Sequence, residues 1–91
     1  MSKSTYTNLQ GSETSKIARN IRLIRELRCY DQRYLAGQLH IARSTLSTWE
    51  TGATPVRIDS LVRLAEVLGL KNYREIIDFD PDAVLKNLPT K

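Results

Sequence analysis

Apolar residues recur along most of the chain at spacings of three and four, which is the period of a helix that buries one face. The first stripe consists of Ile17, Ile21 and Ile24. Thr14 or Ser15 is suited to cap the helix that carries this stripe. We therefore expect a first helix over residues 15–28, followed by a short break.

Four further segments have the same period: residues 32–39, 43–51, 58–68 and about 72–79. Asp31 is suited to cap the second helix, and Gly52 and Gly69 are placed to end the third and fourth helices in the left-handed conformation. Asp80 and Pro81 suit the cap and first position of a possible short sixth helix. No segment alternates with the period of a strand, so the sequence predicts an all-α fold, a compact five-helix bundle with this possible sixth helix at the C-terminus.

Length and composition indicate one small globular domain, because the chain has 91 residues, of which 41% are hydrophobic and 26% charged. Residues 1–14 are rich in Ser and Thr and lack the apolar centre of a signal peptide, so we expect a flexible N-terminal arm. No apolar run approaches the roughly 20 residues of a membrane helix. These features favour a cytoplasmic protein that makes no membrane contact.

Residues that commonly carry chemistry are scarce. Cys29 and His40 are the only residues of their kinds, so we expect neither an internal disulfide nor a metal site. The sequence has no Gly-rich phosphate loop and no His/Asp/Ser or Cys/His set. We therefore predict a protein that is not an enzyme and that uses no cofactor.

The charge is distributed unevenly along the chain. Residues 1–63 contain ten Lys/Arg and five Asp/Glu, a balance of +5, whereas residues 64–91 contain four and five, a balance of −1. A basic N-terminal part favours a polyanionic partner such as nucleic acid, although a solvated basic surface gives the same balance.

The third predicted helix has an unusual outer side. Its inner side is expected to carry Ala42, Leu46 and Trp49, and its outer side Ser44, Ser47, Thr48 and Thr51. Ser and Thr favour helix less than Lys, Glu or Gln, so helix stability does not explain these outer residues. Short hydroxyl side chains allow a helix to approach base edges in the major groove, and the long side chain of Arg43 can reach a guanine or a phosphate. Two short helices joined by about three residues, the second with such a surface, predict a helix-turn-helix.

The segment QRYLAGQLHIARSTLSTWETG resembles the helix-turn-helix of the lambda-repressor-like DNA-binding domains, also called the Cro/repressor or xenobiotic-response-element type. The resemblance covers residues 16–70. It implies base-reading roles for Gln32, Arg43, Ser44, Ser47 and Thr48, and a structural ion pair between Arg25 and Glu50. The positions of Arg25 at the edge of the apolar stripe and of Glu50 near Leu46 agree with such a pair.

This sequence departs from the family pattern at four positions. His40 stands in the turn where the family prefers Gly, and Cys29 replaces another usual Gly. The turn position requires a positive φ, which His tolerates better than most residues. Ala42 and Arg57 stand where capping residues are common, so helix boundaries there are less well defined by sequence.

The expected partner is double-stranded DNA, in the nucleoid of the cytoplasm. Candidate phosphate contacts are Arg19, Arg22, Arg33, Thr51 and Arg57, and we expect about half of the basic candidates to face solvent instead. Residues 15–70 thus form the predicted DNA-binding domain. The function expected from all these features is a sequence-specific transcriptional regulator, above all a repressor of bacterial or phage type.

One such domain contacts few base pairs, so a homodimer on a palindrome is expected, with reading helices about 34–36 Å apart. Residues 71–91 form a C-terminal helical segment that supplies apolar residues for the dimer interface: Ile76, Ile77, Phe79, Val84 and Leu88. Leu23 and Leu27 are a second candidate interface. Two alternatives stay open, an antitoxin-like repressor whose C-terminal segment also binds a toxin, and a protein–protein adaptor on the same fold.

Overall fold

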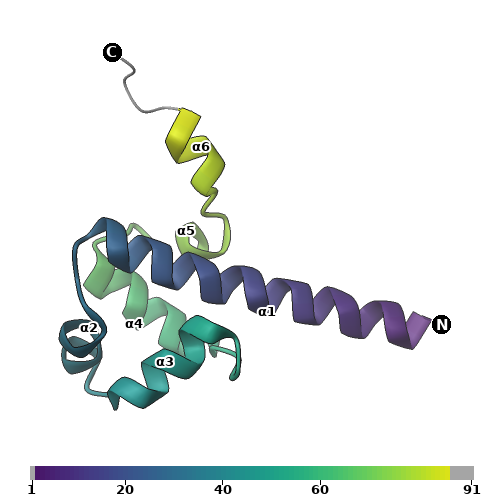
Figure 1. Cartoon of the computed structure of the whole chain (residues 1–91), viewed down its shortest axis with the longest axis horizontal. Helices are drawn as coiled ribbons and strands as arrows, with labels where there is room; N and C mark the ends of the chain where they lie inside the picture. Colours follow the sequence, from purple (N-terminus) through teal and green to yellow (C-terminus); the bar gives the residue numbers. More distant parts are fainter. Residues whose placement is uncertain (1, 87–91) are drawn as a thin grey trace.

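The computed structural model describes the backbone of residues 2–86 and the side chains of residues 13–83. It contains six helices, α1 (Ser2–Leu27), α2 (Gln32–Leu39), α3 (Arg43–Thr51), α4 (Ile58–Leu68), α5 (Arg74–Ile77) and α6 (Pro81–Lys86). The C-terminal half of α1 packs with α2 to α5 into one body, from which the N-terminal half of α1 and all of α6 project (Figure 1). No strand occurs within residues 2–86, so the predicted all-α fold is confirmed.

The predicted helix boundaries at α2 and α3 are confirmed by their caps. The Asp31 carboxylate accepts a 2.7 Å hydrogen bond from the Tyr34 amide at the start of α2. His40 ends α2 with φ 59°, the left-handed conformation that its place in the turn required. Gly52 ends α3 with φ 82°, and Gly69 ends α4 with φ 77°. At these helix ends the chain changes direction, so that α2, α3 and α4 pack around one core.

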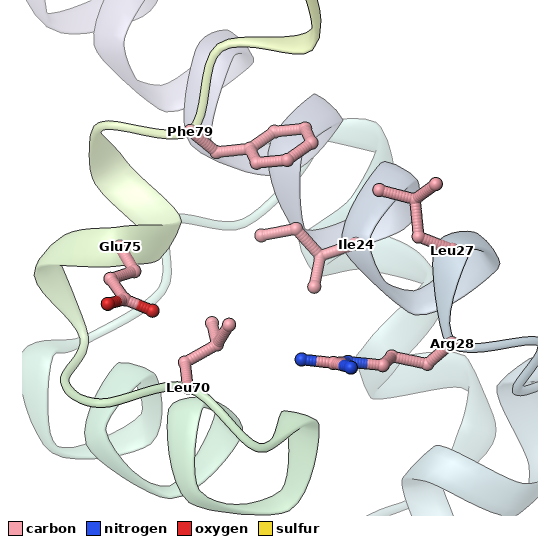
Figure 2. Close-up of a pocket in the computed structure, with 6 residues that line it drawn as sticks. All are labelled: Ile24, Leu27, Arg28, Leu70, Glu75 and Phe79. Atoms are coloured by element: carbon pink, nitrogen blue, oxygen red, sulfur yellow. The ribbon is translucent and has the colours of Figure 1, made fainter. Parts of the chain in front are cut away.

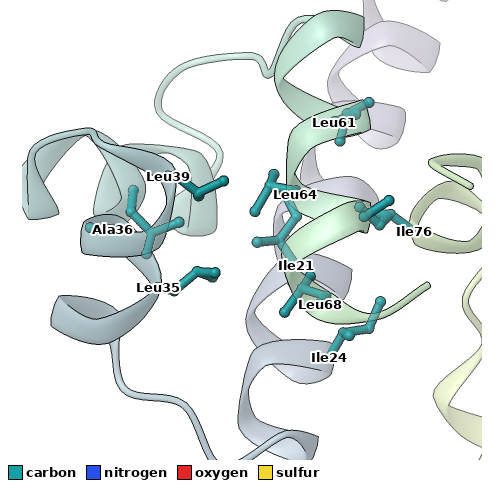
Figure 3. Packing of buried hydrophobic residues seen from close by; sticks show 11 residues of the cluster. Ile21, Ile24, Leu35, Ala36, Leu39, Leu61, Leu64, Leu68 and Ile76 are labelled. Atoms are coloured by element: carbon teal, nitrogen blue, oxygen red, sulfur yellow. The ribbon is translucent and has the colours of Figure 1, made fainter.

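The core consists of the apolar stripes of α1, α2 and α4, closed by single residues of α3 and α5 (Figure 3). Its largest fully buried apolar side chains are Ile21, Leu35, Leu39, Leu46, Leu64, Leu68 and Ile76. Leu46 is the residue by which α3 is held, since it is 0% exposed while most of the α3 surface faces outward. Burial of such a side chain stabilises a fold by about 1.5–3 kcal/mol.

Two helix boundaries differ from the prediction. The first helix begins at Ser2 instead of near residue 15, so neither Thr14 nor Ser15 caps it, and residues 2–14 are helical where an irregular arm was expected. Once a packed helix exists, each added residue gains one hydrogen bond without a new nucleation cost, which allows extension through polar residues. The fifth helix is only Arg74–Ile77 instead of about 72–79, because Tyr73 and Asp78 flank a single turn.

The C-terminal segment contributes to the core of the single chain. Ile76 is 0% exposed and is therefore wrong as a predicted dimer contact, because none of its surface is available to a second copy. Ile77 and Phe79 are partly buried and pack against the same core. The side chain of Val84 and all of Leu88 lie outside the described residues.

Asn20 is a buried polar residue that the apolar pattern does not reveal. It is 0% exposed, and its side-chain amide donates a 2.8 Å hydrogen bond to the Ile76 carbonyl and a 3.5 Å bond to the Ile77 carbonyl. Both acceptors belong to the single turn of α5, whose last carbonyls have no partner within the helix. Asn20 therefore fastens α5 to α1.

Replacement of Asn20 by alanine is expected to destabilise the domain by about 1–3 kcal/mol, because a buried carbonyl loses its donor. Chemical unfolding followed by circular dichroism measures this loss. Replacement of Lys16, an exposed residue of the same helix, by alanine is the matched control and should change stability by less than about 0.5 kcal/mol. Equal stability of the two variants would show that water replaces the amide at no cost.

Candidate nucleic-acid interface

The turn between α2 and α3 orients α3 so that one side is packed and the other is exposed. α2 packs against α3 and α4, and α3 packs against α1, so α3 is held from behind while its outer side stays open. Arg43 and Ser44 are exposed, and Ser47 and Thr48 are half-exposed. We call these four residues the reading face. It contains no carboxylate, because the one acid of α3, Glu50, is buried at 6% exposure.

The hydroxyl groups of this helix are not equivalent. Thr48 donates a 2.7 Å hydrogen bond to the Thr45 carbonyl, so its proton is occupied while its oxygen and methyl group stay available. The Thr51 hydroxyl lies 3.3 Å from the Thr48 carbonyl and accepts a 3.4 Å bond from the Ala53 amide, so it helps to end the helix. Among the side-chain hydrogen bonds that α3 forms with the described residues, none involves Ser44 or Ser47. They are therefore the hydroxyls most open to a partner.

The predicted ion pair between Arg25 and Glu50 is present at the back of α3. The Arg25 Nε lies 2.7 Å from Glu50 Oε2, and its Nη2 lies 3.0 Å from Glu50 Oε1, a two-point contact. Arg25 also donates a 2.7 Å bond to the Tyr30 carbonyl, beyond the end of α1. Because the side chains are only 10% and 2% exposed, the pair is well shielded from solvent and fixes α3 against α1.

The hydrogen bond from Arg25 to Glu50 raises the pKa of the guanidinium above its usual value, against the opposing effect of burial. A raised folded-state pKa adds stability that is fully present below the unfolded pKa and is lost as pH rises through the folded pKa. Since the pKa of an unperturbed guanidinium already lies far above neutral pH, this loss lies still higher. The ionisation of Arg25 therefore gives the domain no pH dependence near neutrality.

Gln32 connects this buried pair to the reading face. Its side-chain nitrogen donates a 3.0 Å hydrogen bond to Glu50 Oε1, and its oxygen accepts a 3.4 Å bond from Arg43 Nε. The chain of contacts thus runs from Arg25 through Glu50 and Gln32 to Arg43. In the free protein Gln32 holds Arg43 at its Nε and leaves the two terminal nitrogens of the guanidinium open, which suits a two-point contact with guanine.

Ala42 does not lie on the inner side of α3, where it was predicted with Leu46 and Trp49. It is exposed, and it has extended backbone angles of φ −70° and ψ 145° with no side-chain capping bond. As the residue before the first helical turn, it does not follow the helical period that was applied to it. The exposed methyl group therefore lies beside the reading face.

The candidate phosphate contacts are spread over several elements. Arg33 and Arg57 are exposed, and Arg57 lies 3.7 Å from Asp59 in a pair too solvated to restrain it. Arg22 pairs with Glu26 at 3.4 Å along α1. Arg19 lies 3.4 Å from the side-chain oxygen of Asn20, which faces α5, so the structure does not bring Arg19 to the reading face.

Arg63 is a positioning residue that sequence reasoning missed. Its guanidinium donates a 2.6 Å hydrogen bond to the Leu39 carbonyl, the last residue of α2. It thereby satisfies an orphan carbonyl and fixes the end of α2 directly before the turn. An exposed basic residue on a helix carries no sequence signal for this role.

The described part of the chain contains neither a membrane-spanning helix nor a cluster of metal ligands. No helix in it combines the length and apolarity needed to cross a bilayer. Within the same residues, no three His, Cys, Asp or Glu side chains gather as metal ligands would.

These elements define a helix-turn-helix protein, with a second helix that is fixed from behind and open in front. The model of a family described as helix-turn-helix matches residues 21–76. The chain belongs to this Cro/C1-type, lambda-repressor-like family. It is therefore a DNA-binding transcriptional regulator, and since the family is not enzymatic, the prediction that the chain is not an enzyme is confirmed.

Two solved structures of bacterial proteins have the same fold. The restriction-modification controller protein C.AhdI from Aeromonas hydrophila is 25% identical, with a TM-score of 0.67 over 71% of this chain and 97% of that chain. A hypothetical transcription factor, NHTF from Neisseria, is 24% identical, with a TM-score of 0.67 over 82% of this chain and 84% of that chain. No curated protein sequence matches this chain.

Proposed function

We propose that this chain is a dimeric repressor that recognises a palindromic operator, with α3 of each copy in the major groove. The observation that carries the proposal is an acid-free reading face whose one arginine is held through Gln32 to a buried ion pair. Exposed hydroxyl groups alone would fit partners of many chemical kinds. A guanidinium held at one nitrogen with its terminal nitrogens open suits the edge of a guanine.

The roles within the proposal follow from exposure and hydrogen bonding. Arg43 reads a guanine, while Ser44 and Ser47 donate to or accept from base edges or phosphates. Thr48 offers its oxygen and methyl group, the latter against a thymine methyl. Gln32 positions Arg43 and reaches a base or phosphate only when it releases one of its internal partners. Arg22, Arg33, Thr51 and Arg57 remain proposed phosphate contacts.

The likeness to a restriction-modification controller protein supports a regulatory role in a bacterium or phage. We infer that such a regulator is controlled by its own concentration or by a partner, and that it acts on the nucleoid in the cytoplasm. An antitoxin-like repressor and a protein–protein adaptor are the competing functions. The adaptor would bind its partner through apolar contacts with little salt dependence, whereas phosphate contacts give a steep loss of DNA affinity with salt.

Selection of bound duplexes from a random DNA pool, at roughly physiological salt, tests the proposal. We expect a two-fold symmetric motif whose half-sites lie about 10 base pairs, or a multiple of that, apart. A folded protein that enriches no sequence would contradict operator recognition. An asymmetric motif of half the length would contradict the dimer but keep the reading face.

Replacement of Arg43 by alanine is expected to cost about 1–3 kcal/mol on the selected site and to relax the preference at one position of each half-site. Fluorescence anisotropy on the selected duplex and on single-base variants measures both effects. Arg57 replaced by alanine is the matched control, since loss of a phosphate contact weakens all sequences equally and lowers the salt dependence. The same uniform loss for Arg43 would reassign it to the backbone.

A further inference from the structure

A cavity of about 290 Å³ opens where the C-terminal end of α1 meets α5 and the loop before it. Its lining residues are Ile24, Leu27, Arg28, Leu70, Glu75 and Phe79 (Figure 2). None of them belongs to α2 or α3, so this cavity is separate from the reading face. The lining is apolar except for Arg28 and Glu75, which lie on opposite sides of it (Figure 2).

The rim of this cavity is incompletely covered within one chain. Leu27 is 59% exposed, although it lies directly beside the cavity. Arg28 forms no ion pair with any residue whose side chain the structure describes. A single exposed leucine is ordinary, but an exposed leucine, an apolar cavity and an unpaired cation together suit an apolar segment that carries an acid.

The chain itself contains such a segment, residues 81–88 with the sequence PDAVLKNL. It has three apolar residues at helical spacing, Val84, Leu85 and Leu88. Asp82 and Lys86 are four positions apart, which is one helical turn. One opposite charge therefore exists for each charged residue of the cavity, the acid for Arg28 and the base for Glu75.

The geometry of α6 does not lead this segment into the cavity of its own chain. α6 begins two residues after Phe79, and its start is fixed by the Asp80 side chain, which accepts a 3.0 Å bond from the Asp82 amide. From there α6 runs away from the body, and it is not among the closely packed pairs of helices (Figure 1). The described part of the segment, α6, therefore leads away from the cavity beside Phe79 (Figure 1).

We propose that two copies of this chain exchange their C-terminal segments, so that residues 81–88 of each copy occupy the cavity of the other. A two-fold axis makes the two contacts identical and leaves no copy with an open cavity. The inference rests on the proposed dimeric function and gives that dimer a contact surface. The proposed dimer interface consists of Leu27, Arg28 and the segment beyond Pro81. It does not include Ile76, whose side chain is buried in the core.

Two glutamate variants test the exchange. Leu27→Glu alters the cavity at an exposed position, and Leu85→Glu alters the segment. Val62→Glu is the matched control, because Val62 is 43% exposed on α4 and does not line the cavity. In sedimentation without DNA at tens of micromolar, wild type and control should be dimers. Each of the other two variants should be monomeric, with a dimer dissociation constant raised about 100-fold or more.

Mixing the two variants separates exchange from other arrangements. In an equimolar mixture, the intact segment of the Leu27→Glu chain meets the intact cavity of the Leu85→Glu chain, so a heterodimer should appear. Native mass spectrometry with one chain isotope-labelled detects it. A mixture that stays monomeric would overturn the exchange in favour of a segment bound to its own chain. Variants that remain dimeric would place the interface elsewhere and leave the cavity to another protein.

The outcome is independent of the DNA-binding proposal. A monomeric wild type that still enriches a half-site would refute the exchange and keep the reading face. An exchanged dimer that enriches no DNA would do the reverse. Circular dichroism of each variant confirms that a loss of dimer is not a loss of fold, which the exposure of Leu27 makes a fair test.

Discussion

Replacement of Glu50 by alanine is expected to lower the free energy of unfolding by about 3–5 kcal/mol, the cost of leaving one member of a buried ion pair alone. Arg25 would keep its charge at 10% side-chain exposure and lose both of its hydrogen bonds to Glu50, with only the 4.0 Å contact to the half-exposed Glu26 left. In a domain of this size such a loss lowers the melting temperature by roughly 12 °C or more. Thermal unfolding followed by circular dichroism measures the effect.

Two controls separate the pair from charge in general. Glu26→Ala removes an acid that is 49% exposed and lies 3.4 Å from Arg22 and 4.0 Å from Arg25, so it tests a solvated contact to the same arginine, and its effect should stay below about 1 kcal/mol. The double variant Arg25→Met with Glu50→Leu removes both buried charges and should lose clearly less stability than Glu50→Ala, about 1–3 kcal/mol at most, because the Tyr30 carbonyl loses its donor. A Glu50→Ala variant as stable as the Glu26→Ala control would contradict the role assigned to the pair.

The double variant also tests whether the ion pair serves DNA recognition. It keeps the core filled but removes the oxygen that holds Gln32, and Gln32 is the contact that orients Arg43. We therefore expect a stable protein with weaker preference at the Arg43 base position. Unchanged preference in that variant would show that Gln32 and Glu50 act on folding alone.

The fold follows from sequence where one face of a helix is consistently apolar and its ends carry a recognisable residue. Asp31, Gly52 and Gly69 act through their own backbone or side chain, so the second to fourth helices were located closely. The start of α1 was missed because its extension depends on a helix already packed elsewhere. The fifth helix was predicted to be too long because the apolar residues of this segment lie partly in the single turn of α5 and partly in the loops beside it.

The site was predictable to the level of which helix presents which residues. Arg43, Ser44, Ser47 and Thr48 lie on the open side of α3, as the hydroxyl pattern indicated. Hydrogen bonds between residues distant in the sequence could not be predicted, because the spacing of apolar residues indicates which positions are buried but not which residues they contact. Asn20 and Arg63 illustrate this limit, since each satisfies a carbonyl on another helix.

The start of α3 lacks two features that commonly stabilise the N-terminus of a helix. Ala42 gives no side-chain capping bond, and the first turn contains no acid. An acid there would favour the helix by about 0.3–1 kcal/mol, through its interaction with the helix dipole. The absence of both the capping bond and the acid at this exposed helix end is consistent with a surface that approaches phosphate groups.

Replacement of Ser44 by glutamate should therefore change stability and DNA binding in opposite directions. The glutamate lies in the first turn of α3 at an exposed position, so folding stability should stay equal or rise by about 0.3–1 kcal/mol. Affinity for the selected duplex should fall by roughly 3 kcal/mol or more, over 100-fold, since the new carboxylate faces phosphates and base edges in each half-site. Anisotropy and thermal unfolding on the same sample measure the two effects.

Asn72→Asp is the matched control for added charge. Asn72 is exposed in the loop between α4 and α5, and an aspartate preserves the oxygen that accepts from the Arg74 amide. It changes the net charge by the same amount as Ser44→Glu, so its effect on affinity reports long-range electrostatics alone. If both variants lose affinity equally, the whole-molecule charge governs binding. A loss confined to Ser44→Glu would mean that the N-terminal turn of α3 lies against the DNA.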